Sequence, residues 1–170
     1  MKLILYAAIC LLCSCNLMKK MDDMVFIQQR TPMPKNLPHI DSILIVANGN
    51  SATEQIMDDI IPLFQQSLQQ RGVVSQSVFV SYTDRHINEQ EFDNRKYSYV
   101  LWIYEQDRKM QQLENYAHLI PLAIKLTDIN NEKNIWIATS IINNLVKKKF
   151  YKEKYAGTLA LLLRANGFVR

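Results

Sequence analysis

The segment from Ser42 to Tyr82 carries the pattern that most restricts the fold of this 170-residue chain. Residues 42–47 form a short, almost continuous apolar run, as expected for a strand that is buried on both faces. An amphipathic helix pattern follows as far as Gly72, and residues 74–82 then alternate apolar and polar side chains. This order of strand, helix and strand predicts a right-handed crossover that joins two parallel strands of one sheet.

Capping residues mark the two ends of this first helix. Ser51 and Glu54 have the spacing of a capping box with Ser51 as N-cap, and Gly72 suits the position just past the helix end. Pro62 lies inside the helical pattern, so we expect a kink there. The apolar face that should pack against the sheet consists of Ile56, Ile60, Leu63, Phe64 and Leu68.

Three more strands and a second helix complete the predicted domain. Apolar or alternating runs cover residues 97–104, 119–127 and 135–142, and residues 128–134 read as a long hairpin turn. The polar segment 83–96 has room for one or two helical turns. The last helix shows an apolar face of Tyr155, Leu159, Leu162 and Leu163 and ends at Asn166-Gly167. The order β-α-β-(α)-β-β-β-α predicts an α/β domain over residues 42–170, with two main helices packed on a mixed five-stranded sheet.

The first fifteen residues indicate a cleaved leader rather than part of the fold. Lys2 is followed by an apolar run that ends at Leu12, and this run is shorter than the ~20 apolar residues that span a bilayer. The sequence Leu12-Cys13-Ser14-Cys15 resembles the lipobox of bacterial lipoproteins. That resemblance implies a signal peptide over residues 1–14 and lipidation of Cys15 with diacylglycerol and a further acyl chain such as palmitate. The membrane would then be a partner through this anchor, because two or more chains hold a protein stably.

The residues after Cys15 bear on the compartment. Residues 15–41 contain three prolines and no sustained apolar period, so they predict a flexible tether, with residues 25–27 able to dock as an edge strand. Asn16 stands where aspartate favours inner-membrane retention in similar lipoproteins, which implies the outer membrane, facing the periplasm. The pair Asp22-Asp23 is faintly similar to surface-export signals, so exposure on the cell surface stays open. Loss of residues 1–14 leaves 156 residues, which is enough for one domain. Their formal charge of +3 gives no indication of nucleic-acid binding.

The predicted hairpin carries a second resemblance. The sequence Leu122-Ala-Ile-Lys-Leu-Thr-Asp128, a polar turn and Ile135-Trp-Ile-Ala138 is similar to a feature of the TolB amino-terminal, CsgG and penicillin-binding-protein-activator group of envelope lipoproteins. The turn differs, because Asn130-Asn131 stands where those proteins often carry Thr-Gly. The resemblance implies an α/β fold in the cell envelope, and it implies no pore and no functional residues.

No catalytic or cofactor motif stands out. Asn48-Gly49-Asn50-Ser51 lies between a strand and a helix, where phosphate can bind, yet the chain has no glycine-rich phosphate loop and capping accounts for these residues. His39, His86 and His118 are far apart and no paired-cysteine pattern exists, so we expect no metal site. The serines lack a nucleophile-elbow motif. We therefore expect no enzyme and no cofactor.

Two surface features are candidates for partner contact. Lys147, Lys148, Lys149, Lys152 and Lys154 form a basic run, which is either a solvated helix start or a contact for an anionic surface. Tyr97 and Tyr99, predicted on one face of a strand, could form an aromatic docking pair.

Together these patterns predict a membrane-anchored lipoprotein that binds another envelope protein and helps to assemble, activate or stabilise it. The alternative is an accessory subunit of an envelope transport or secretion complex, which oligomerisation of the domain would favour.

Overall fold

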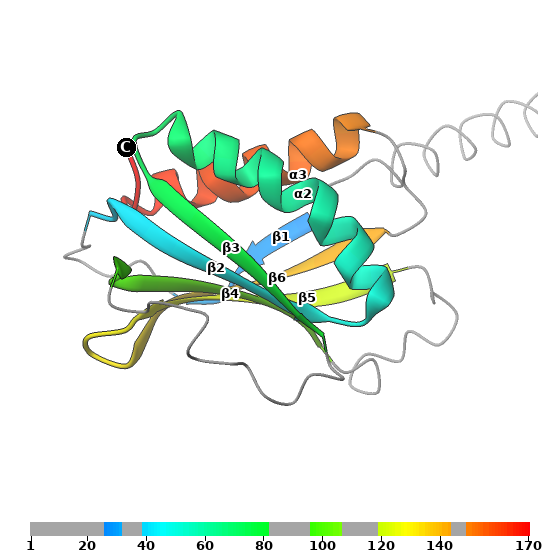
Figure 1. Ribbon diagram of the computed structural model, residues 1–170, viewed down its shortest axis with the longest axis horizontal. Coiled ribbons are helices and arrows are strands. Elements are labelled where there is room, and N and C mark those ends of the chain that lie inside the picture. The colour runs from blue at the N-terminus through cyan, green and yellow to red at the C-terminus, as the bar shows by residue number, and fades with distance from the viewer. Residues whose placement is uncertain (1–25, 32–38, 82–95, 107–118, 144–148) are drawn as a thin grey trace, which may run out of the picture.

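The protein is a two-layer α/β domain in which both helices cover one face of a six-stranded sheet (Figure 1). The computed structural model describes residues 26–31, 39–81, 96–106, 119–143 and 149–170. The strands are β1 (Phe26–Gln29), β2 (Ser42–Gly49), β3 (Val74–Ser81), β4 (Tyr99–Glu105), β5 (Leu119–Asp128) and β6 (Lys133–Asn143). The helices are α2 (Ser51–Gln69) and α3 (Lys149–Ala165).

The strands lie in the order β1-β6-β5-β4-β2-β3, and the sheet is mixed. β2 pairs in parallel with both β3 and β4, while the pairs β4–β5, β5–β6 and β6–β1 are antiparallel. The predicted α/β class, the two helices and the parallel β2–β3 pair are therefore confirmed. The predicted helical turns within residues 83–96 lie outside the described residues.

The expected strand number of five was wrong by one, because β1 adds a strand at the edge. Phe26 is registered against Ile141 of β6, so part of the segment expected as a flexible tether belongs to the sheet. Ile40 is likewise fully buried, and its N–H donates to the carbonyl of Phe168 at 2.9 Å. The expected docking of an edge strand at residues 25–27 is confirmed for Phe26 and Ile27, whereas its pairing partner depends on an edge that only the folded sheet supplies.

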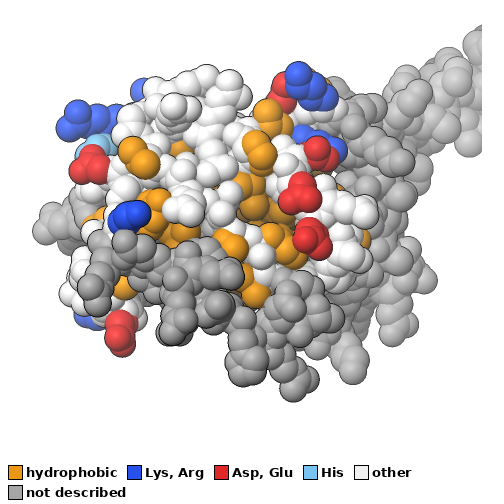
Figure 2. All heavy atoms as spheres, viewed as in Figure 1, with side chains coloured by type: hydrophobic (Ala, Val, Ile, Leu, Met, Phe, Trp, Pro, Cys, Tyr) orange, Lys and Arg blue, Asp and Glu red, His pale blue; other side chains and the backbone are white. Residues whose placement is uncertain are grey.

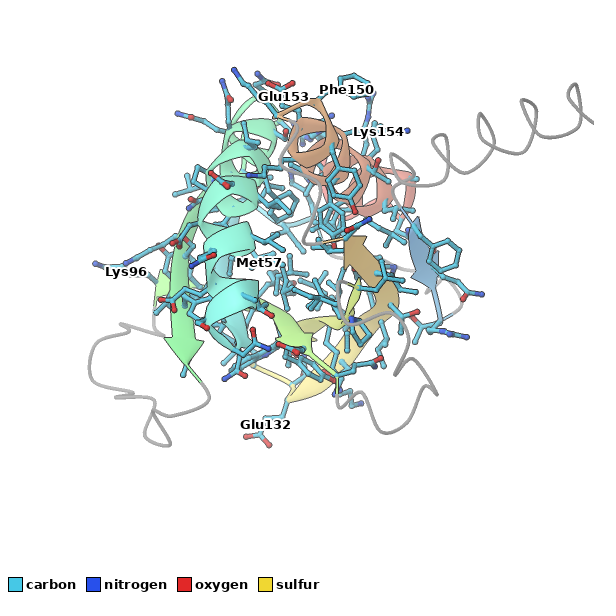
Figure 3. All side chains as sticks on the ribbon, turned by 90° about the vertical axis from the view of Figure 1, so that its right-hand side faces the viewer. Met57, Lys96, Glu132, Phe150, Glu153 and Lys154 are labelled. Atoms are coloured by element: carbon cyan, nitrogen blue, oxygen red, sulfur yellow. The ribbon has the colours of Figure 1, made fainter. Side chains whose placement is uncertain are left out.

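The main core lies between the helices and the sheet. On α2, Met57, Ile60, Phe64 and Leu68 are buried, and on α3 Tyr155, Leu159 and Leu163 are buried. Figure 3 shows Met57 pointing from α2 into this interior. Burial at this spacing confirms the predicted apolar faces, with Ile56, Leu63 and Leu162 at their partly buried margins.

The helix ends agree with prediction at their glycines and differ at the first cap. Asn50, not Ser51, caps α2, because its side-chain oxygen accepts the N–H groups of Ala52 and Thr53. Gly72 and Gly167 have φ values of 76° and 75°, and each helix closes with a Schellman pattern of hydrogen bonds. α2 remains one helix through Pro62, whose side chain is exposed to solvent.

Candidate protein-binding edge

The outer edge of β3 is the candidate interaction surface. β3 is the last strand of the sheet, and no strand of the described chain pairs with its outer side. Its sequence Val-Ser-Gln-Ser-Val-Phe-Val-Ser contains no charged residue and no proline. Natural proteins usually protect edge strands with charges, prolines or bulges, because an open edge is a template for another chain. Val74, at its start, is 66% exposed.

The direction of the backbone groups shows which part of this edge is open. The N–H of Val74 donates to the carbonyl of Asp41, so Val74 faces β2. In a parallel ladder, alternate residues face opposite sides, and the backbone groups of Ser75, Ser77 and Phe79 therefore point outward. The amide nitrogen of Gln65 donates to the carbonyl of Ser75 at 3.2 Å. Gln65 thus covers the first outward carbonyl and also accepts the hydroxyl of Ser77 at 3.4 Å, and no strand of the described residues pairs with the backbone from Ser77 onward.

A shallow hollow of about 360 Å³ lies beside this edge. It is lined by Gln65, Gln69, Gly72, Val73, Val74 and Ser75, where the end of α2 meets the start of β3. Figure 2 shows hydrophobic side chains on this face of the molecule, over α2 and β3. A partner strand along β3 would find apolar surface beside the open backbone groups.

The carboxyl ends of β2 and β4 are bridged by a protein side chain. β2 lies between the parallel strands β3 and β4, and the carboxyl ends of such strands are common ligand sites in α/β sheets. Here Glu105 accepts the amide of Asn50 at 3.0 Å, the backbone N–H of Asn50 at 3.3 Å and the hydroxyl of Thr53 at 2.6 Å. The carboxylate occupies the anion position at the start of α2. Capping, not phosphate binding, accounts for residues 48–51.

Close packing supports this arrangement. A Cβ atom at Gly49 would lie 2.6 Å from the side-chain carbons of Thr53, and Thr53 is 1% exposed. Glycine therefore allows β2 to approach the first turn of α2 closely enough for the contacts to Glu105.

The described lysines of the basic run lie in the first turns of α3. Lys152 forms an ion pair with Asp59 of α2, and Lys149 lies 3.6 Å from Glu153. Lys154 is exposed, and Figure 3 shows it beside Phe150 and Glu153 at this end of the molecule. Two of these three lysines thus have acidic partners within the domain. Lys147 and Lys148 lie outside the described residues, as does Cys15.

The structure separates the two tyrosines expected to share a face. Tyr99 packs against the helix-side core, whereas Tyr97 packs with Trp102 on the opposite side of the sheet. Tyr97 precedes the first residue of β4, so strand alternation does not extend to it. Its hydroxyl donates to Gln76 of β3 at 3.0 Å. The prediction of a paired aromatic surface was therefore wrong.

The described residues bring together no group of three His, Cys, Asp or Glu side chains that could hold a metal ion. Within the same residues, neither helix has the length and apolar character needed to cross a membrane.

The β3 edge was not predicted from the sequence. Its uncharged residues are visible in the chain, whereas its place at the edge of the sheet is not.

Comparison with known proteins rests on fold alone. No protein-family model and no curated protein matches the chain. The PelC dodecamer from Paraburkholderia phytofirmans has a similar structure, with a TM-score of 0.51 and 14% identity over 86% of this chain and 100% of that chain. A variant of that dodecamer gives a TM-score of 0.49 at 15% identity, covering 83% of this chain and 98% of that one. A Xanthomonas campestris protein of family-model DUF330 gives 0.44 at 12% identity, covering 81% and 92%. The resemblance to the TolB, CsgG and activator lipoproteins stays a prediction, because these structures do not belong to that group.

Proposed function

We propose that this chain is a lipid-anchored envelope protein that acts by binding, and that the β3 edge joins it to further copies of itself. The observation that carries the proposal is the eight-residue edge strand without a charge or a proline. Such an edge tends to aggregate unless a partner covers it. The lipobox-like sequence supports the anchor, with Cys15 as the lipidated residue and the outer membrane as the site.

Self-association also fits the assembly of a protein with a similar fold. The Paraburkholderia phytofirmans protein of similar fold is a dodecamer. Copies joined through their sheet edges would make this chain a subunit of an envelope complex, as in the predicted transport or secretion role. No enzyme activity and no cofactor form part of this proposal.

A second candidate is an assembly factor for a different envelope protein. The two edges of the sheet are unequal, since β1 has four residues and β3 has eight. A β1 edge cannot pair along the whole of β3, whereas a longer strand from another protein could do so. Strand addition of this kind is a common mode of peptide recognition.

Substitution of Ser77 tests the edge directly. Proline at this position removes an outward N–H and leaves the ladder to β2 intact, so Ser77→Pro should fold and lose edge pairing. Ser77→Thr keeps the N–H and serves as the matched control. We expect the detergent-solubilised full chain and the threonine variant to form oligomers in light scattering, and the proline variant to be monomeric with a similar melting temperature.

The alternatives give different results. An oligomer of unchanged mass in Ser77→Pro would exclude the β3 edge as the self-contact. If the wild-type protein is monomeric and captures a different envelope protein, and Ser77→Pro loses this capture, the result would instead favour the role as an assembly factor.

A further inference from the structure

A basic hollow lies at the end of the molecule where both helices finish. It measures about 500 Å³ and is lined by Gln70, Arg71, Arg164 and Arg170. Arg71 follows α2, Arg164 lies in the last turn of α3, and Arg170 lies beyond it. Figure 2 shows basic side chains at this end, where Figure 1 marks the C-terminus. Three arginine residues therefore line one hollow, and no acidic side chain of the described residues lines it.

Helix capping explains only one of the three arginines. Cations are favourable at a helix C-terminus because the macrodipole is negative there, and Arg71 donates to the carbonyl of Ser67 at 2.5 Å. The Schellman bonds already satisfy other terminal carbonyls, including those of Leu68 and Leu163. The side chains of Arg164 and Arg170 form no hydrogen bond or ion pair with the rest of the described chain. Arg164, in the last turn of α3, still interacts favourably with the macrodipole, whereas Arg170 lies past both helices, so the helix ends alone do not account for three arginines at one hollow.

The local charge is also unbalanced. Asp41, near this end of the molecule, is 85% exposed and lies 3.2 Å from His39, and it does not line the hollow. Nε of Arg71 is buried and has no acceptor within the described residues. A buried charged donor without an acceptor is costly, and nearby like charges repel. An anion in the hollow would relieve the repulsion between the arginines.

We propose that this hollow binds a phosphate group. Guanidinium groups match the oxygen geometry of phosphate and bind it in a bidentate way, and several arginines around one site suit a group with more than one negative charge. The group could belong to a lipid head group or to a soluble phosphate compound. The hollow is distinct from the β3 edge, so this proposal does not depend on the proposed function.

Calorimetric titration with pyrophosphate tests the site in the full, detergent-solubilised chain at low salt. We expect saturable binding that weakens as salt rises. The double variant Arg164→Gln/Arg170→Gln should weaken binding about tenfold or more, because it removes charge-assisted contacts to the anion. Neither side chain has a partner among the described residues, so the melting temperature of this double variant should match that of the wild type. The control Lys133→Gln/Lys154→Gln removes the same charge from exposed positions elsewhere and should bind like wild type.

Competition identifies the source of the phosphate. Micelles doped with phosphatidylglycerol should displace pyrophosphate if the natural ligand is a head group, and micelles doped with a zwitterionic lipid serve as the reference. Binding of pyrophosphate without this competition would point to a soluble phosphate compound. Equal binding of pyrophosphate by both double variants would show non-specific charge attraction and overturn the proposal. The proposal would also fail if neither pyrophosphate nor phosphatidylglycerol bound in a way that depends on the arginines.

Discussion

At the scale of single residues, Glu105 decides whether the carboxyl ends of β2 and β4 can hold a ligand. The carboxylate lies at the end of β4 and accepts hydrogen bonds from Asn50 and Thr53 at the start of α2. A free phosphate or carboxylate ligand would have to displace it from the helix N-terminus. The side chain thus turns a frequent ligand position of α/β sheets into a structural contact.

Tyr155 makes the stability of the domain sensitive to alkali. Its side chain is fully buried, and its hydroxyl lies 2.5 Å from Oγ of Ser140. Burial raises the pKa of Tyr155 well above its usual value of 10.0, although the Ser140 contact acts in the opposite direction. Above pH 10 the unfolded chain loses this proton while the native state keeps it. Stability is therefore full below about pH 10 and falls as pH rises further, by up to about 1.4 kcal/mol per pH unit for this group.

Urea denaturation at a series of pH values checks this expectation. Tyr155→Phe should reduce the alkaline slope and cost about 1–3 kcal/mol at neutral pH, because Ser140 loses its buried partner. Burial also raises the pKa of Tyr151, so part of the alkaline slope should remain in Tyr155→Phe. An unchanged slope in Tyr155→Phe would show that other groups cause the alkaline loss.

At the scale of secondary-structure elements, the buried face of α2 holds the two layers together. Phe64 is 1% exposed and belongs to the main core, so Phe64→Ala should lower the free energy of unfolding by about 3–5 kcal/mol. Leu161→Ala is the control, because Leu161 is 53% exposed on α3 and should cost little. Chemical denaturation measures both variants. Equal small losses would mean that Phe64 does not anchor α2 to the sheet.

At the scale of the whole molecule, the predicted anchor and the folded domain should be separable. Cys15→Ser removes the sulfur that the lipobox-like sequence assigns to lipidation. We expect the variant to be unprocessed or absent from the membrane fraction, with a folded domain of unchanged melting temperature. Membrane fractionation and mass spectrometry of the N-terminus measure this. A fully processed Cys15→Ser protein in the membrane fraction would exclude the anchor.

Local patterns in the sequence determined the class of this protein. The apolar run of β2, the face of α2 and the stop signals at Gly72 and Gly167 depend on neighbours a few residues apart. The same local signals misplaced the cap by one residue, because Asn50 and Ser51 are both good caps and the long-range contact with Glu105 favours Asn50.

Only the tertiary structure decided where the candidate binding surfaces lie. β1 gains its strand from pairing with β6, far along the chain, and β3 becomes an edge only because β4 lies on the other side of β2. The three arginines meet because α2 and α3 finish at the same end of the molecule. These features depend on contacts between distant segments, which local periodicity does not encode.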